Sequence, residues 1–110
     1  MKARELLQSN DSAIVLFTRG PHFHIGKGGH GKSGNWRINT ARKFNKVIIY
    51  RRAEDMENAD VYIGDYLESI PSAEANRWVV VFDHLKNPGT TDLTWKEFCG
   101  GSQNPVRYLG

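Results

Sequence analysis

The chain has 110 residues, of which 39% are hydrophobic and 25% charged. This balance predicts one globular domain over residues 1–110 and excludes a disordered tail. No apolar run approaches the roughly 20 residues of a membrane span, and the single cysteine, Cys99, excludes an internal disulfide. No signal-peptide pattern follows Met1, so the expected location is the cytoplasm.

In chain order, residues 2–8 predict two helical turns, which the turn residues at 9–12 end. Residues 13–18 (AIVLFT) are continuously apolar with β-branched members, and they predict a buried strand. Residues 36–40 alternate between apolar and polar, which predicts a short strand. Residues 46–52 (KVIIYRR) predict the second clear strand.

The next part of the chain reads as strands joined by tight connections. Residues 53–58 are polar and acidic and predict a hairpin-type connection to a strand over residues 60–69. Gly64 interrupts that strand and predicts a bulge. Residues 70–76 predict a turn before the strongest strand, residues 77–83.

The C-terminal part holds a turn, a helix and an edge strand. Residues 87–89 (NPG) predict the turn, residues 93–98 a short helix with its N-cap at Thr91-Asp92, and residues 106–109 the closing strand. Because strands follow one another without long helices, the expected fold class is mostly β with short helices (α+β). We expect a small, mainly antiparallel barrel rather than a βαβ sheet.

The charge is divided unevenly along the chain. Residues 1–52 carry eleven Lys and Arg against two acids, a net +9, and residues 53–110 carry four against ten, a net −6. A basic half of this kind is typical of binding to a polyanion such as nucleic acid. The alternative is that the two halves neutralise each other across the fold.

Residues 19–39 are glycine-rich and basic, lack acids, and hold three of the four histidines. They show no apolar period, so they predict a long surface loop, and such loops are usually functional. The six glycines within residues 20–34 predict a loop that is mobile until an anion orders it. If its histidines face a polyanion, affinity should rise as the pH falls through about 6.5.

Residues 26–33 (GKGGHGKS) match the phosphate-loop pattern, and residues 79–83 resemble a strand that ends in a metal-holding aspartate. A phosphate loop requires a strand before it and a helix that opens at its Lys-Ser pair. Gly34 and Asn35 would break such a helix, and the remaining chain is too short for that fold. We interpret the match as chance and expect no cofactor.

His22 and His24 are two residues apart, so on a strand their side chains would lie on one face. This spacing can bind a metal, with Asp83 or His84 as further ligands. A complete site normally shows three or four ligands, so we expect exposed or phosphate-facing histidines and no metal. We interpret Cys99 as a half-buried small residue rather than as a nucleophile. No nucleophile–histidine constellation is visible, so no catalytic residue is expected and an enzyme is not the favoured class. Histidine acid–base chemistry leaves a phosphodiesterase as an alternative.

Some aromatic residues stand directly beside an arginine, a combination that suits phosphate contacts and base stacking. Examples are Trp36-Arg37, Tyr50-Arg51 and Arg77-Trp78. We interpret Trp78 and Trp95 as core residues that arginine covers by cation–π packing. Trp36 is flanked by polar residues, so we interpret it as functional.

The order of these segments resembles the PUA-like barrels, including the ASCH and EVE domains. The resemblance covers residues 34–98, with Trp36 after a basic loop, then VIIYRR, DVYIGDYLE, RWVVVF and TWKEF. It implies a pseudo-barrel that reads nucleic acid and, in EVE-like members, an aromatic cage for a modified, flipped base. Only Trp36 and Tyr50 match cage positions, and the Gly/His loop departs from the family.

The favoured function is therefore a nucleic-acid-binding module for DNA or RNA with an unpaired, extruded or modified base. A protein-interaction accessory protein, as phages and plasmids encode, is the alternative from another class. The expected binding residues are cations, histidines and two aromatics: His22, His24, Lys27, His30, Lys32, Trp36, Arg37, Arg42, Lys43 and Tyr50. Lys46 is expected to contact phosphate as well.

Overall fold

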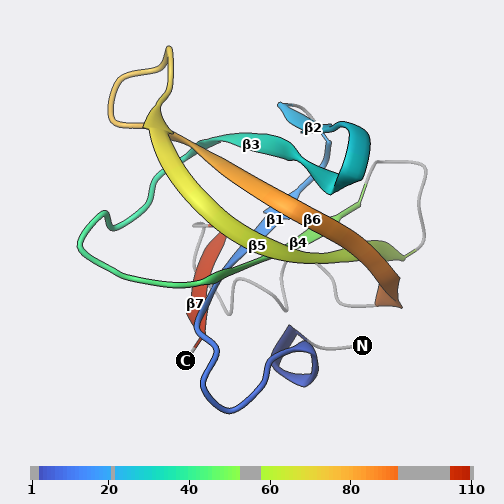
Figure 1. Cartoon of the computed structure of the whole chain (residues 1–110). Coiled ribbons are helices and arrows are strands. Elements are labelled where there is room, and N and C mark those ends of the chain that lie inside the picture. The colour runs from blue at the N-terminus through green and yellow to red at the C-terminus, as the bar shows by residue number, and fades with distance from the viewer. Residues whose placement is uncertain (1–2, 21, 53–57, 92–104, 110) are drawn as a thin grey trace.

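A computed structural model describes residues 3–20, 22–52, 58–91 and 105–109, and seven strands dominate them (Figure 1). Two 3₁₀ turns accompany the strands. The elements are η1 (Ala3–Leu6), β1 (Ala13–Thr18), β2 (Phe23–Ile25), η2 (Lys27–Gly29), β3 (Gly31–Trp36), β4 (Lys46–Arg51), β5 (Ala59–Pro71), β6 (Trp78–Thr91) and β7 (Val106–Leu109). The expected mostly β class is confirmed. No helix of the described residues is long and apolar enough to cross a membrane.

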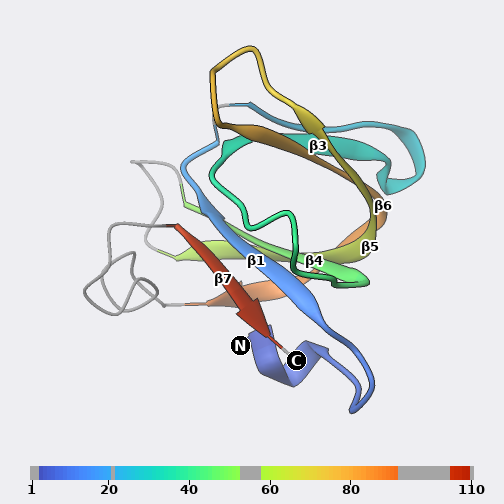
Figure 2. The same ribbon diagram turned by 90° about the vertical axis from the view of Figure 1, so that its left-hand side faces the viewer.

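The strands form one mixed sheet in the order β2-β3-β6-β5-β4-β1-β7, which curves but does not close on itself (Figure 2). β1 and β4 pair in parallel, whereas the other pairings are antiparallel. The sheet is therefore mainly antiparallel, as expected, with β1 and β4 as its one parallel pair among the described strands. Residues 19–45 separate β1 from β4, which is long enough for the crossover that parallel strands need.

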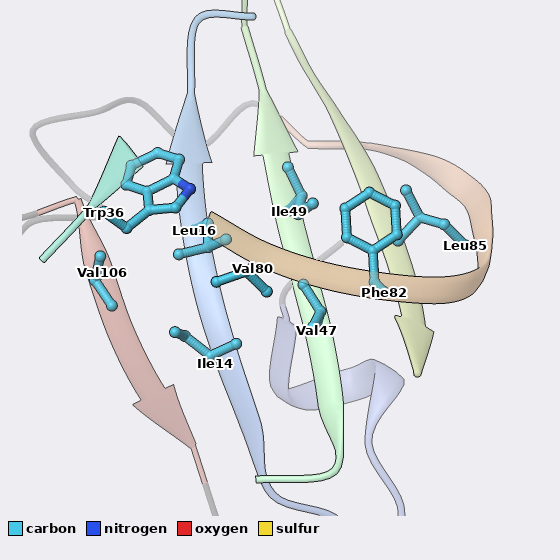
Figure 3. Packing of buried hydrophobic residues seen from close by; sticks show 9 residues of the cluster. All are labelled: Ile14, Leu16, Trp36, Val47, Ile49, Val80, Phe82, Leu85 and Val106. Atoms are coloured by element: carbon cyan, nitrogen blue, oxygen red, sulfur yellow. The ribbon is translucent and has the colours of Figure 1, made fainter. Parts of the chain in front are cut away.

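The β1–β4 pair is buried on both faces, because successive side chains of a strand point to opposite sides. Ile14, Leu16, Val47 and Ile49 face an inner cluster with residues of β3, β6 and β7, which Figure 3 shows. The alternate residues face an outer cluster with β5, against which Leu6 and Leu7 pack: Ala13, Val15, Phe17, Ile48, Tyr50, Ala59 and Val61. Burial on both faces explains the continuous apolar runs of these strands.

The predicted bulge at Gly64 is confirmed by register shifts between β5 and β6 on both sides of it. A Cβ at Gly64 would lie 2.8 Å from the carbonyl oxygen of Asp83, so only glycine allows this approach. His84, opposite, has a φ of +53°. The turn expected at 87–89 is wrong: β6 continues through it, because Pro88 falls at a register shift where its missing N–H breaks no ladder bond.

Other boundaries also differ from the sequence-based expectations. The helix expected over residues 2–8 is a single 3₁₀ turn. The strand expected over 36–40 ends at Trp36, and β5 extends through Pro71. The connection over 53–57 and the helix expected at 93–98 lie outside the described residues, whereas the edge strand at 106–109 is confirmed.

Candidate nucleic-acid interface

The glycine-rich stretch is a β-hairpin, so the expectation of a long surface loop is wrong. β2 pairs with β3, and β3 pairs in turn with β6. A Cβ on Gly31 would overlap the carbonyl oxygen of His24, and one on Gly29 would overlap the backbone of Leu85. These glycines therefore allow close packing of backbone segments. In the sequence, a glycine with this role looks the same as a glycine in a flexible loop.

The hairpin does not present a phosphate cradle. The amide of Gly26 donates to the carbonyl of His30 at 2.7 Å, and the amide of Gly29 donates to that of Gly26 at 3.3 Å. Ser33 is fully buried, and its hydroxyl accepts a hydrogen bond from the Trp36 indole N–H at 3.0 Å. Two of the amides that would wrap a phosphate in a phosphate loop, and the hydroxyl that would bind magnesium, are thus already engaged.

Replacing Lys32 with alanine is therefore expected to leave the response to ATP and magnesium unchanged. A ligand at 100 times its dissociation constant adds about 2.7 kcal/mol of stability, so a thermal-shift assay with parent and variant measures the effect. No ATP hydrolysis is expected. A magnesium-dependent stabilisation that Lys32→Ala abolishes would contradict this assignment.

The hairpin divides the predicted basic and histidine residues between different places. His24, His30 and Lys32 border a largely apolar hollow of about 370 Å³, and Lys27 is exposed in η2. His22 borders another hollow, beside Arg19. Within residues 3–20, 22–52, 58–91 and 105–109, no three His, Cys, Asp or Glu residues group as metal ligands would.

The two aromatic residues predicted to read a base lie in the core. Trp36 is 6% exposed within the inner cluster (Figure 3), and Tyr50 is 2% exposed within the outer cluster. The Tyr50 ring packs edge-on against Phe17 with centroids 6.1 Å apart. Neither ring offers a free face for base stacking in this conformation, and they belong to separate clusters. An aromatic cage built from this pair is therefore not present.

A different set of aromatic residues surrounds an open pocket. Phe44, Tyr66 and Trp78 line it from the 37–45 segment, β5 and β6, and all three are half-buried. The Phe44 and Tyr66 rings pack edge-on with centroids 4.4 Å apart. The pocket measures about 200 Å³, and its other lining residues are Ile38, Asn39, Thr40, Arg42 and Ser69. We call it the aromatic pocket.

The segment over residues 37–45, which carries one wall of the pocket, crosses one end of the curved sheet from β3 to β4 (Figure 2). The Tyr108 hydroxyl accepts a hydrogen bond from the Asn39 amide at 2.8 Å, and the Asn39 side chain accepts one from the amide of Ala41. At the other end, the Asn45 side chain accepts a hydrogen bond from the Ser12 amide at 2.8 Å. The segment is therefore held at both ends although it has no regular structure.

Exposed cations surround this pocket wall. The Arg42 guanidinium lies 4.7 Å from the centre of the Tyr108 ring, a cation–π contact that also places it at the pocket. Arg37 and Lys43 belong to the same segment and are exposed. Lys27 lies on the opposite side of the molecule, in η2 (Figure 1). The structure thus gathers Arg37, Arg42 and Lys43 on one segment and leaves the hairpin cations elsewhere.

Lys46 is engaged with carboxylates rather than free for phosphate. Its ammonium donates to Asp65 at 2.7 Å, and the other oxygen of that carboxylate lies 3.0 Å from Nδ1 of His84. The Lys46 hydrogen bond is the main reason that the pKa of Asp65 lies below its usual value, and the same bond raises the pKa of Lys46. At the end of the 37–45 segment, a hydrogen bond from the Asn45 side chain lowers the pKa of Asp11.

Asp65→Asn is expected to cost about 0.2–1 kcal/mol of stability at neutral pH, as for exposed ion pairs. The pKa of Asp65 is lower in the folded protein than in the unfolded chain, where it is near 3.8. The ion pair therefore stabilises the fold above about pH 3.8, and this stabilisation is lost as the pH falls through the pKa of the folded protein. The difference between parent and variant should therefore shrink below about pH 4. Denaturant unfolding across pH measures it, with Glu68→Gln on the same strand as control. A difference that persists at low pH would contradict the pairing.

The fold and this site define a small mixed β protein with an aromatic pocket under a basic segment. Searches against protein-family models, curated proteins and solved structures found no match. Sequence reasoning identified Arg37, Arg42 and Lys43 but missed Phe44 and Tyr66. Their positions beside the basic residues 42–43 and after the Gly64 bulge were the available signals.

Proposed function

We propose that the protein binds single-stranded or locally unpaired nucleic acid and accepts one base in the aromatic pocket. The observation that carries this proposal is the conjunction of three half-buried rings with Arg42 in one pocket. Aromatic faces stack on any base, and adjacent cations bind the phosphates on either side. Apolar ligands would need the rings but not the cations of this segment.

The dimensions favour one planar ring over a larger ligand. The pocket measures about 200 Å³, below the range of about 300–1,000 Å³ that is typical of drug-sized ligands. The hydroxyls of Tyr66 and Ser69 lie 2.7 Å apart at its wall, where they offer donors and acceptors to a base edge. A base must leave the duplex stack to enter such a recess.

Reading of intact duplex by a recognition helix does not fit the described elements. That mode needs a helix long enough to lie in the major groove. The described helical segments span four and three residues. We therefore favour unpaired or extruded bases over duplex sequence.

We also infer that the curved sheet is a PUA-like pseudo-barrel of the ASCH or EVE kind. The strand that carries Gly64 and the order of the segments over residues 34–98 support this relationship. The family's aromatic cage would then correspond to Phe44, Tyr66 and Trp78 in place of Trp36 and Tyr50. This replacement is our proposal and rests on burial alone.

Binding to a panel of fluorescent oligonucleotides, modified bases included, tests the function. Affinity should fall as salt rises, with a log–log slope of about −0.7 per phosphate neutralised on a single strand. Arg42→Gln and Lys43→Gln should each reduce the slope by about that amount, whereas Lys27→Gln on the opposite side should not. Absence of binding to every oligonucleotide at low salt would contradict the proposal.

The alternative of a protein-interaction module has one observation in its favour. Ile25, Leu67 and Ile70 are large apolar side chains that are 44%, 49% and 39% exposed. Affinity capture with and without nuclease treatment separates the two functions. Protein partners that persist after nuclease treatment favour the alternative, and partners that disappear favour nucleic acid.

A further inference from the structure

The hollow beside Arg19 and His22, which shares no lining residue with the aromatic pocket, brings two arginines and a histidine together from three segments. Arg19 follows β1, His22 precedes β2, and Arg77 precedes β6, and all three border a hollow of about 390 Å³. Thr18 and Asn35 add a hydroxyl and an amide, and Glu74 is the one acid among its described lining residues. We call it the arginine hollow.

Hydrogen bonds hold the backbone of each of these three residues in position. The Thr18 hydroxyl accepts a hydrogen bond from the Gly20 amide at 3.0 Å, which fixes the turn that carries Arg19. The His22 carbonyl accepts a bond from the Gly34 amide at 3.0 Å. Arg77 accepts from the amide of Ser72 and donates its own amide to Glu74, so the β5–β6 turn fixes it.

Within the described residues, neither the Arg19 nor the Arg77 guanidinium group has a carboxylate partner. Glu74 lies in the same hollow but is not within ion-pair distance of either. Arg77 is nevertheless half-buried, and a half-buried cation gains most from a ligand that supplies the missing negative charge.

His22 has a φ of +61°, a conformation that non-glycine residues rarely adopt. Such strain persists where the surrounding structure over-determines it, and it clusters at ligand sites. Here the bond from Gly34 holds the residue at the border of the arginine hollow. His22 and the two arginines thus border one hollow.

We propose that the arginine hollow binds a phosphomonoester, either the terminal phosphate of a nucleic-acid strand or the phosphate of a free mononucleotide. Such a group carries about −1.5 to −2 charges and three terminal oxygens, enough acceptors for two guanidinium forks and an imidazole. A carboxylate offers only two oxygens and one negative charge, whereas two arginines carry two positive charges and two forks of donors. This inference goes beyond the base pocket, because it holds even if no base enters that pocket.

The experiment has two arms that identify the source of the phosphate. In the first, fluorescence anisotropy compares one short single strand with a 5′-phosphate, with a 3′-phosphate and with neither. In the second, calorimetry compares AMP with adenosine and needs no strand binding. The parent protein should prefer the phosphorylated member of one or both arms by roughly tenfold or more, as expected for charge-assisted bonds.

The variants Arg19→Gln and Arg77→Gln should each remove most of that preference, whereas Lys86→Gln, an exposed cation outside the hollow, should retain it. Arg19 is exposed, so its variant remains informative if Arg77→Gln unfolds. A preference only for strand ends or only for AMP identifies the source and supports the site. Equal binding of phosphorylated and unphosphorylated forms in both arms, or a preference that Arg19→Gln leaves unchanged, would overturn it.

The two proposals fail in different ways. If no strand binds but AMP binds through Arg19, the nucleic-acid function fails and the phosphate site stands. If strands bind without regard to their terminal phosphate and adenosine matches AMP, the phosphate site fails while the proposed function stands.

Discussion

Phe82→Ala is expected to lower the free energy of unfolding by about 3–5 kcal/mol, the usual cost of emptying a buried phenylalanine site. Phe82 is fully buried in the inner cluster, beside Leu85 and near Ile49 and Val47 (Figure 3). The Phe23 ring of the hairpin lies 6.1 Å from it between centroids. Because small domains are stable by only about 5–15 kcal/mol, this loss is a large fraction of the total.

Chemical denaturation monitored by circular dichroism measures this loss. Leu67→Ala is the matched control, since Leu67 is 49% exposed on β5 and should change stability by less than about 0.5 kcal/mol. Equal losses in the two variants would mean that Phe82 is not the centre of the inner cluster, and the packing of β6 over β1 and β4 would be wrong.

Phe44→Leu and Trp78→Leu are each expected to weaken single-strand binding by roughly tenfold. Base–aromatic stacking contributes about 1–3 kcal/mol per base, and leucine keeps the site apolar while it removes the stacking face. The salt dependence should stay the same, because no phosphate contact is lost. Anisotropy titrations at several salt concentrations measure both quantities.

Phe23→Leu is the control for these variants. Phe23 is also a half-buried aromatic residue of the inner cluster, packed 5.3 Å from the Tyr62 ring, but it does not line the aromatic pocket. It should bind like the parent protein. A loss with Phe23→Leu as large as with Phe44→Leu would show that the effect comes from the core and not from the pocket.

The central strands could be predicted from the sequence, whereas the hairpin could not. β1 and β4 are buried on both faces, so every residue of 14–17 and 47–50 is apolar and the run is visible without tertiary information. The roles of Gly29 and Gly31 depend on Leu85 and His24 backbone atoms that approach them in the fold. A glycine that serves such an approach looks, in sequence, like a glycine of a mobile loop.

The aromatic residues show the same limit of local reasoning. Trp36 and Trp78 both stand beside arginine and are cross-strand partners in β3 and β6. The sequence pattern favoured Trp36 as functional and Trp78 as core. In the structure Trp36 is buried and its indole N–H donates to Ser33, whereas Trp78 borders the aromatic pocket. Register and the path of the 37–45 segment decide which ring is covered, and neither is encoded in the flanking residues.

A double-mutant cycle tests most directly whether a base occupies the aromatic pocket. Its four measurements combine the parent protein or Phe44→Leu with one single strand, either intact or with every base removed. We expect the parent to prefer the intact strand by roughly tenfold or more and Phe44→Leu to lose most of this preference, since the ring and base act as a pair. Equal binding of both strands by the parent, or a preference that survives in Phe44→Leu, would contradict this expectation.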